Sequence, residues 1–172
     1  NYYQKVLEMD PQHTNANYNL GSVHYKLKDL NKAKNHFEKT IEAQPNFAIA
    51  HFSLGNVQSE LKEFKKAKNS YEKAVELRPD FASAQNNLGL IFRELGEPKD
   101  AVSCYKKTIE INSNHAGAYN NLGRIYTEVG EFDKAIEAHQ AATKIEPENL
   151  YHYFYLSELN KKFLNNDLKN TV

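Results

Sequence analysis

The 172-residue chain contains no tryptophan, one methionine and one cysteine. A single cysteine, Cys104, excludes an intrachain disulfide and a zinc site built on cysteines. It also favours a reducing compartment, so we expect a cytoplasmic location. There is no apolar run of membrane-spanning length, and no basic segment followed by an apolar one opens the chain. We therefore expect neither a transmembrane helix nor a signal peptide.

An excess of charge of either sign is also missing, because 22 lysines and arginines balance 22 aspartates and glutamates. A neutral chain lacks the basic surface that nucleic acids and anionic membranes require, so we expect no partner of either kind. Glycine and proline are scarce, with seven and five residues, and no low-complexity linker is present. The chain is long enough to bury a core as one domain or one short array.

Sequence motifs for catalysis are absent as well. The seven histidines are scattered, and no HExxH, P-loop, GxGxxG or GxSxG motif occurs. His139 stands where a core aromatic is expected, so its predicted role is packing rather than metal binding. We expect no catalytic residue, no metal and no cofactor, and the chain is predicted not to be an enzyme.

What the chain does have is a period of 34 residues, which marks a repeat protein. Glycines and the leucines before them keep this spacing, at Gly21, Gly55, Gly89 and Gly123 and at Leu20, Leu54, Leu88 and Leu122. The same holds for alanines and aromatics, at Ala33, Ala67, Ala101 and Ala135 and at Phe37, Tyr71 and Tyr105. Prolines repeat too, at Pro11, Pro45, Pro79 and Pro147. Agreement at so many registers excludes chance.

Each repeat is predicted to form two helices. In residues 82–115 a first apolar stripe steps by four, three and four residues, through Ala84, Leu88, Ile91 and Leu95. Gly96 interrupts the pattern, and Pro98 suits the first turn of the next helix. Small residues allow the two helices to approach closely while an aromatic fills the space beside them. Neither helix can bury its apolar face alone, so the predicted fold is an all-α solenoid of antiparallel helix pairs.

The spacing resembles the tetratricopeptide repeat (TPR), which implies a right-handed superhelix. Four repeats are predicted at residues 14–47, 48–81, 82–115 and 116–149. Residues 1–13 resemble the second helix of an incomplete N-terminal repeat, and residues 150–172 resemble a C-terminal capping helix and tail. The resemblance implies a non-catalytic scaffold whose partner is a protein or peptide.

The candidate binding surface is a polar row on the first helix of each repeat. Residues two, six, nine and thirteen of a repeat share one helix face and avoid the buried stripe. Asn19, Asn87 and Asn121 occupy the sixth place, and an asparagine amide can pair with both the N–H and the C=O of a peptide backbone. The row resembles the asparagine ladder of the superhelical TPR arm of O-GlcNAc transferases, which implies that these three residues contact the ligand.

A compositional explanation stays open, because 20 of the 172 residues are asparagine. In a chain rich in asparagine, some exposed positions are asparagine because of composition alone, without selection for binding. Asn86 and Asn120, next to the ladder positions, fit that explanation.

The remaining candidate groove residues come from the same helices. They are Asn56, Arg124, Glu94 and Glu128 on the polar row, with Tyr18 and Phe52 as aromatic neighbours. Glu60, Glu94 and Glu128 form an acidic row that would suit a ligand carrying lysine or arginine, but pairing with Arg93 and Arg124 inside the protein is the favoured reading. Tyr18, Tyr25 and Phe52 fit either an apolar pocket or packing between repeats.

The C-terminal end suggests two alternatives to groove binding. It is rich in aromatics, with Tyr151, Tyr153, Phe154, Tyr155 and Phe163. Exposed apolar patches mark interfaces, so uncapped ends that stack head to tail would make the chain a self-assembling scaffold. Residues 156–169 also resemble the segment that ends TPR arrays in some proteins with a C-terminal sulfotransferase domain, which would make the chain the recognition arm of a larger enzyme.

Overall fold

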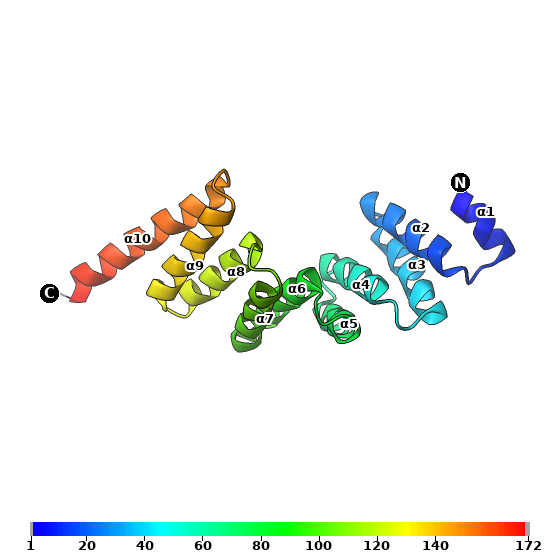
Figure 1. Cartoon of the computed structure of the whole chain (residues 1–172), viewed down its shortest axis with the longest axis horizontal. Helices are drawn as coiled ribbons and strands as arrows, with labels where there is room; N and C mark the ends of the chain where they lie inside the picture. Colours follow the sequence, from blue (N-terminus) through cyan, green and yellow to red (C-terminus); the bar gives the residue numbers. More distant parts are fainter. Residues whose placement is uncertain (1, 171–172) are drawn as a thin grey trace. The chain divides into compact units, whose positions relative to one another are not determined.

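The computed structural model describes the backbone of residues 2–170 and the side chains of residues 2–159 and 161. This part of the chain contains ten helices and no strand (Figure 1). The helices are α1 (Tyr2–Met9), α2 (Thr14–Lys26), α3 (Leu30–Ala43), α4 (Ala48–Glu60), α5 (Phe64–Leu77), α6 (Ala82–Glu94), α7 (Pro98–Ile111), α8 (Ala116–Glu128), α9 (Phe132–Ile145) and α10 (Leu150–Asn170). The prediction of an all-α fold is confirmed.

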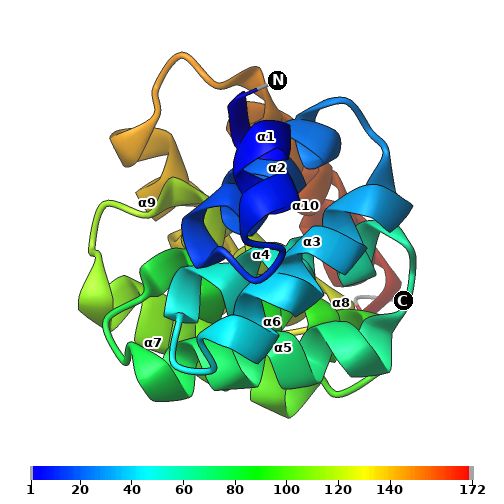
Figure 2. The ribbon, with the colours of Figure 1, turned by 90° about the vertical axis from the view of Figure 1, so that its right-hand side faces the viewer.

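The helices form two compact units, one ending at Gly96 and the other beginning at Glu97. In the first unit each helix packs on the next, from α1 beside α2 to α5 beside α6 (Figure 1 and Figure 2). In the second unit α7, α8, α9 and α10 pack in the same sequential way. Packing of each helix on its chain neighbours is the organisation of an α-solenoid.

Helix starts and turns follow local side-chain chemistry. The side chain of Asp29 accepts a hydrogen bond from the Lys32 N–H and caps α3, and Pro98 begins α7. The turn inside each repeat needs one residue in the left-handed region. Gly96 and Gly130 supply it with φ of 76° and 81°, whereas Lys28 and Lys62 adopt 60° and 59° with a side chain that disfavours this conformation.

The predicted close approach of small residues and aromatics is present in the first unit. A Cβ atom added to Gly21 would lie 2.8 Å from the Phe37 ring, and Phe37 is buried. At Gly55 the same atom would lie 2.7 Å from the ring of Tyr71. These contacts leave no room for a methyl group, so glycine lets the two helices of a repeat share one aromatic side chain.

The apolar residues at the start of α10 are exposed. Leu150 is 78% exposed, Tyr151 73% and Phe154 57%, whereas Leu159 on the same helix is buried. Phe163, which belongs to the predicted aromatic end, lies outside the described side chains. Within the part of the chain that the structure describes, no helix combines the length and the apolar character needed to cross a membrane.

Candidate functional site

The first unit contains a small hollow between its helices, with a volume of about 190 Å3. This first hollow is lined by Tyr25, Asn56, Ser59, Glu60, Tyr71, Asn87 and Leu90. The lining comes from α2, α4, α5 and α6. Two of the predicted ligand residues, Asn56 and Asn87, therefore meet here although 31 positions separate them.

Hydrogen bonds hold these two amides in place. The Tyr71 hydroxyl donates to Asn56 Oδ1 at 2.7 Å, and Asn87 Nδ2 donates to the same oxygen at 3.0 Å. Asn86 Nδ2 in turn donates to Asn87 Oδ1 at 3.3 Å. The Nδ2 group of Asn56, a double donor, makes no hydrogen bond among the described residues. The hydrogen bonds from Tyr71 and Asn87 therefore orient the Asn56 amide, and its Nδ2 donor belongs to a residue that lines the first hollow.

The acidic residue of the first hollow is already paired. Lys28 Nζ lies 2.8 Å from Glu60 Oε2, and the Tyr25 hydroxyl donates to Glu60 Oε1. The hydrogen bonds from Lys28 and Tyr25 lower the pKa of the Glu60 carboxyl. Burial, together with the bond to Glu60, raises the pKa of Tyr25 to about 12. The charge of Glu60 is therefore compensated inside the protein.

A second hollow of about 250 Å3 lies in the second unit, between α8, α9 and α10. It is lined by Arg124, Thr127, Glu128, His139, Phe154, Tyr155, Glu158 and Leu159. Six of these residues stand two repeats, 68 positions, after a lining residue of the first hollow: Asn56, Ser59, Glu60, Tyr71, Asn87 and Leu90 correspond to Arg124, Thr127, Glu128, His139, Tyr155 and Glu158. The two hollows thus occupy the same place in the repeat.

The charged groups of the second hollow are paired differently from Glu60. Glu158 pairs with Lys161 at 3.0 Å, with side-chain exposures of 44% for Glu158 and 70% for Lys161. The Arg124 guanidinium lies 6.0 Å from the centre of the Tyr155 ring. Neither Glu128 nor Arg124 has an ion-pair partner among the described residues. The second hollow therefore keeps charged groups that are available to a ligand.

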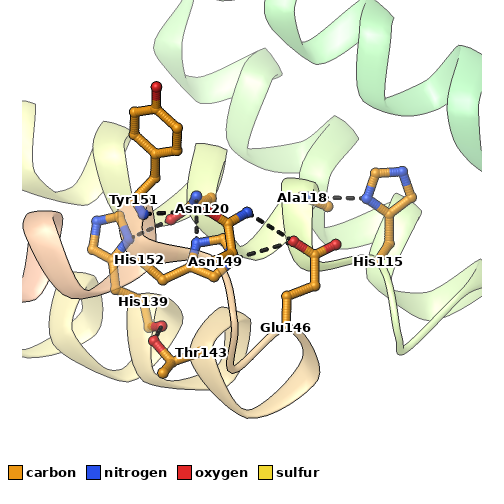
Figure 3. A network of polar contacts seen from close by, with 9 residues as sticks. All are labelled: His115, Ala118, Asn120, His139, Thr143, Glu146, Asn149, Tyr151 and His152. Carbon is orange, nitrogen blue, oxygen red and sulfur yellow. Dashed lines mark hydrogen bonds and ion pairs between the residues drawn. The ribbon is translucent and has the colours of Figure 1, made fainter.

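His139, which lines the second hollow, belongs to a chain of hydrogen-bonded polar side chains (Figure 3). His139 Nδ1 donates to Asn120 Oδ1 at 2.8 Å, and Asn120 Nδ2 donates to His152 Nδ1 at 2.8 Å. The Nε2 atom of His152 then donates to Glu146 Oε2 at 3.3 Å. Both rings are buried, with exposures of 1% for His139 and 2% for His152. Asn120 thereby connects α8 to α9 and α10.

The buried histidine is held neutral by its surroundings. Burial lowers the pKa of His139 to about 4, and the nearby His152 and Arg124 act in the same direction. Its ring stacks on Tyr155 at 5.1 Å, and a Cβ atom added to Gly123 would lie 2.7 Å from its Nε2. His139 occupies the place of the core aromatic, as predicted, and packs against the repeat's glycine.

The other predicted groove residues lie outside the two hollows. Asn19 and Asn121 are half-buried, on α2 and α8, and Glu94 is exposed and pairs with Arg93 at 3.0 Å. Tyr18 packs against Phe37 and Phe47, with ring centres 5.7 and 5.2 Å apart. Phe52 packs against Tyr71 and Phe81. Of the two readings of these aromatics, the contacts favour packing between helices.

Several residues of the hollows, and two asparagines that are hydrogen-bonded to lining residues, were not singled out from the sequence. The phenol of Tyr71 was read as core, yet its hydroxyl reaches Asn56. Asn86 and Asn120 were open to a compositional explanation, yet both amides make specific hydrogen bonds. Glu158 and Leu90 were findable, because they occupy the ninth place of the same polar row.

No group of three or more histidine, cysteine or acidic side chains with metal-binding geometry occurs among the described residues. The hollows combine amide, hydroxyl, carboxylate and aromatic groups, which suit reversible binding through hydrogen bonds and apolar contact.

Comparison with known proteins agrees with this architecture. The family model described as tetratricopeptide repeat matches residues 12–80 and 80–148. A crystal structure of MamA is similar with a TM-score of 0.82 and 28% identity, covering 85% of each chain.

Two further structures share the fold at lower identity. YrrB, described as a TPR protein with an unusual peptide-binding site, has a TM-score of 0.80 and 22% identity over 96% of this chain and 85% of its own. PilF of Pseudomonas aeruginosa has a TM-score of 0.83 and 20% identity over 96% and 75%. No curated protein sequence gives a significant match. Since the family model covers most of its length, the chain belongs to the tetratricopeptide-repeat family.

Proposed function

We propose that the chain is a non-catalytic protein-interaction module that holds an extended segment of a partner protein along the first helices of its repeats. The observation that carries the proposal is the recurrence of one hollow at equivalent repeat positions in both units. A regularly repeated binding place suits a ligand that is itself regular, such as an extended peptide backbone.

In this proposal the asparagines bind the backbone of the partner. Asn87 Nδ2 and the Tyr71 hydroxyl both donate to Asn56 Oδ1, so the amide of Asn56 is oriented before a ligand arrives. Pre-orientation lowers the entropy lost on binding. Asn19 and Asn121 occupy the repeat position of Asn87 and extend the row. YrrB, with its described peptide-binding site, is a precedent for this use of the fold.

The proposal is tested by selecting peptides from a displayed library of random dodecapeptides and measuring their affinity by fluorescence anisotropy. The double variant Asn56→Ala/Asn87→Ala should lower the affinity about tenfold or more, which is about 1.4 kcal/mol. Asn69→Ala on the exposed face of α5 is the matched control, and circular dichroism checks that all variants remain helical. Equal affinity of the double variant and the wild type would refute a role for the first hollow.

A second candidate function is head-to-tail association, favoured by exposed apolar residues on both α1 and α10. Tyr2 is 75% exposed and Met9 89%, and Leu150 and Tyr151 are similarly exposed. By register α1 resembles a second helix of a repeat and α10 a first helix, so α1 of one copy could complete a pair with α10 of another. Sedimentation velocity over a concentration series tests this, and Tyr151→Ser should abolish any oligomer. The enzyme-arm alternative stays a prediction.

A further inference from the structure

We propose that the second hollow binds one basic side chain, lysine or arginine, of the partner segment, and that Glu128 and Glu158 select its positive charge. The inference rests on the proposed function and deepens it, because it assigns a side-chain preference to one of the two equivalent binding places. It also gives the hollows different tasks: the first contacts backbone, and the second selects a residue.

The two hollows differ in their carboxylates. The first hollow has one, Glu60, whose two oxygens are taken by Lys28 and by the Tyr25 hydroxyl. At the place of Leu90 in the first hollow, the second hollow has Glu158. The second hollow therefore has one more carboxylate at an equivalent position and lacks the internal lysine that compensates Glu60.

Among the described residues that line the second hollow, two are carboxylates, Glu128 and Glu158, and one is a cation, Arg124. Glu128 has no ion-pair partner among the described residues. The Lys161 and Glu158 side chains are 70% and 44% exposed, so their ion pair holds Glu158 only weakly. The balance favours a positively charged ligand group.

The other walls of the second hollow suit the same ligand. Because the Nδ1 atom of His139 donates to Asn120, its Nε2 atom is left as a hydrogen-bond acceptor on a neutral ring. Phe154, which is 57% exposed, offers an aromatic face, which binds both the methylene groups and the charge of a basic side chain. The volume of about 250 Å3 lies below that of drug-sized ligand sites, roughly 300–1,000 Å3, and fits a single side chain.

The test is a titration of the 15N-labelled full chain, followed by NMR, with blocked heptapeptides of glycine and serine. The central residue of the peptide is lysine, arginine, glutamine or glutamate. The lysine and arginine peptides should shift the amide signals of residues 124–128 and 154–158. Comparing the two peptides shows which basic residue the second hollow prefers. The glutamine peptide should bind more weakly, by roughly two- to fivefold for a partly exposed ion pair, and the glutamate peptide should be weakest.

Variants sharpen the test because the expected effects have opposite signs. Glu158→Gln should weaken binding of the lysine peptide by roughly two- to fivefold, and Arg124→Gln should strengthen it. Glu137→Gln, which removes the same charge from the exposed face of α9, should change nothing. Leu90→Glu should introduce a preference for the lysine peptide at the first hollow.

The outcomes separate this inference from the proposed function. Equal binding of the lysine and glutamine peptides at the second hollow overturns the inference, while shifts at Asn56 and Asn87 would keep the proposed function. Tightest binding of the glutamate peptide, lost in Arg124→Gln, shows that the hollow selects an acidic residue and also overturns it. If no peptide shifts signals at either hollow, the inference and the proposed function both fail.

Discussion

The buried histidine of the second unit should make folding stability depend on pH. His139 has a pKa of about 4 in the folded protein, against an ordinary value of about 6.5 in an unfolded chain. Between these values the unfolded state binds the proton more tightly, so stability is constant above pH 6.5 and falls as the pH drops toward 4. Between about pH 7.5 and about pH 5, the free energy of unfolding should fall by about 2 kcal/mol when solvent screening is neglected. With screening, the expected decrease is about 1 kcal/mol.

The perturbation that isolates this effect is His139→Phe, because Phe37 occupies the equivalent place against Gly21. Urea unfolding followed by circular dichroism, at several pH values from 7.5 to 5, should show a shallower pH dependence for the variant by about 1–2 kcal/mol. Burial lowers the pKa of His36 as well, but that contribution is present in both proteins and cancels in the difference.

Amide hydrogen exchange locates the effect within the chain. The acid-induced loss of protection should lie in α8, α9 and α10, where the groups facing His139 are Arg124, His152, Glu128 and Glu158. Parallel pH profiles for the wild type and His139→Phe would refute the assignment of a depressed pKa to this residue.

Three backbone predictions follow from the same structure, all measured by thermal unfolding. Gly55→Ala places a methyl group 2.7 Å from the Tyr71 ring and should destabilise by about 1–2 kcal/mol, since overpacking outweighs the gain in helix propensity. Gly117→Ala, whose new atom meets its nearest neighbour at 3.4 Å, should stabilise by up to about 1 kcal/mol. Lys62→Gly relieves a left-handed φ of 59° and should stabilise by about 1 kcal/mol, in line with Gly96 at the same place of the third repeat.

The candidate site was only partly predictable from the sequence. Helix periodicity placed Asn56 and Asn87 on one polar row, and the structure brings both to the first hollow. Helix periodicity could not predict that the Tyr71 hydroxyl would reach Asn56, because an aromatic residue at that position is expected to lie in the core. Asn19 and Asn121 share the position of Asn87 and line neither hollow.

The sequence left the role of Asn86 and Asn120 open. Both interrupt a helical pattern and fitted a compositional bias. The partners of Asn120 are His139 on α9 and His152 on α10, 19 and 32 residues away. Such pairs are created when helices stack, so only the folded chain could identify them.

The sequence by itself determined the repeat, its two-helix unit, and the places of glycines against aromatics. These features follow from local periodicity and from residue size, and both recur in every repeat. Tertiary structure decided which polar groups of different repeats meet, which carboxylates are compensated and which histidines are buried neutral. Those outcomes depend on distances between side chains on separate helices. A 34-residue period in the sequence gives no information about these distances.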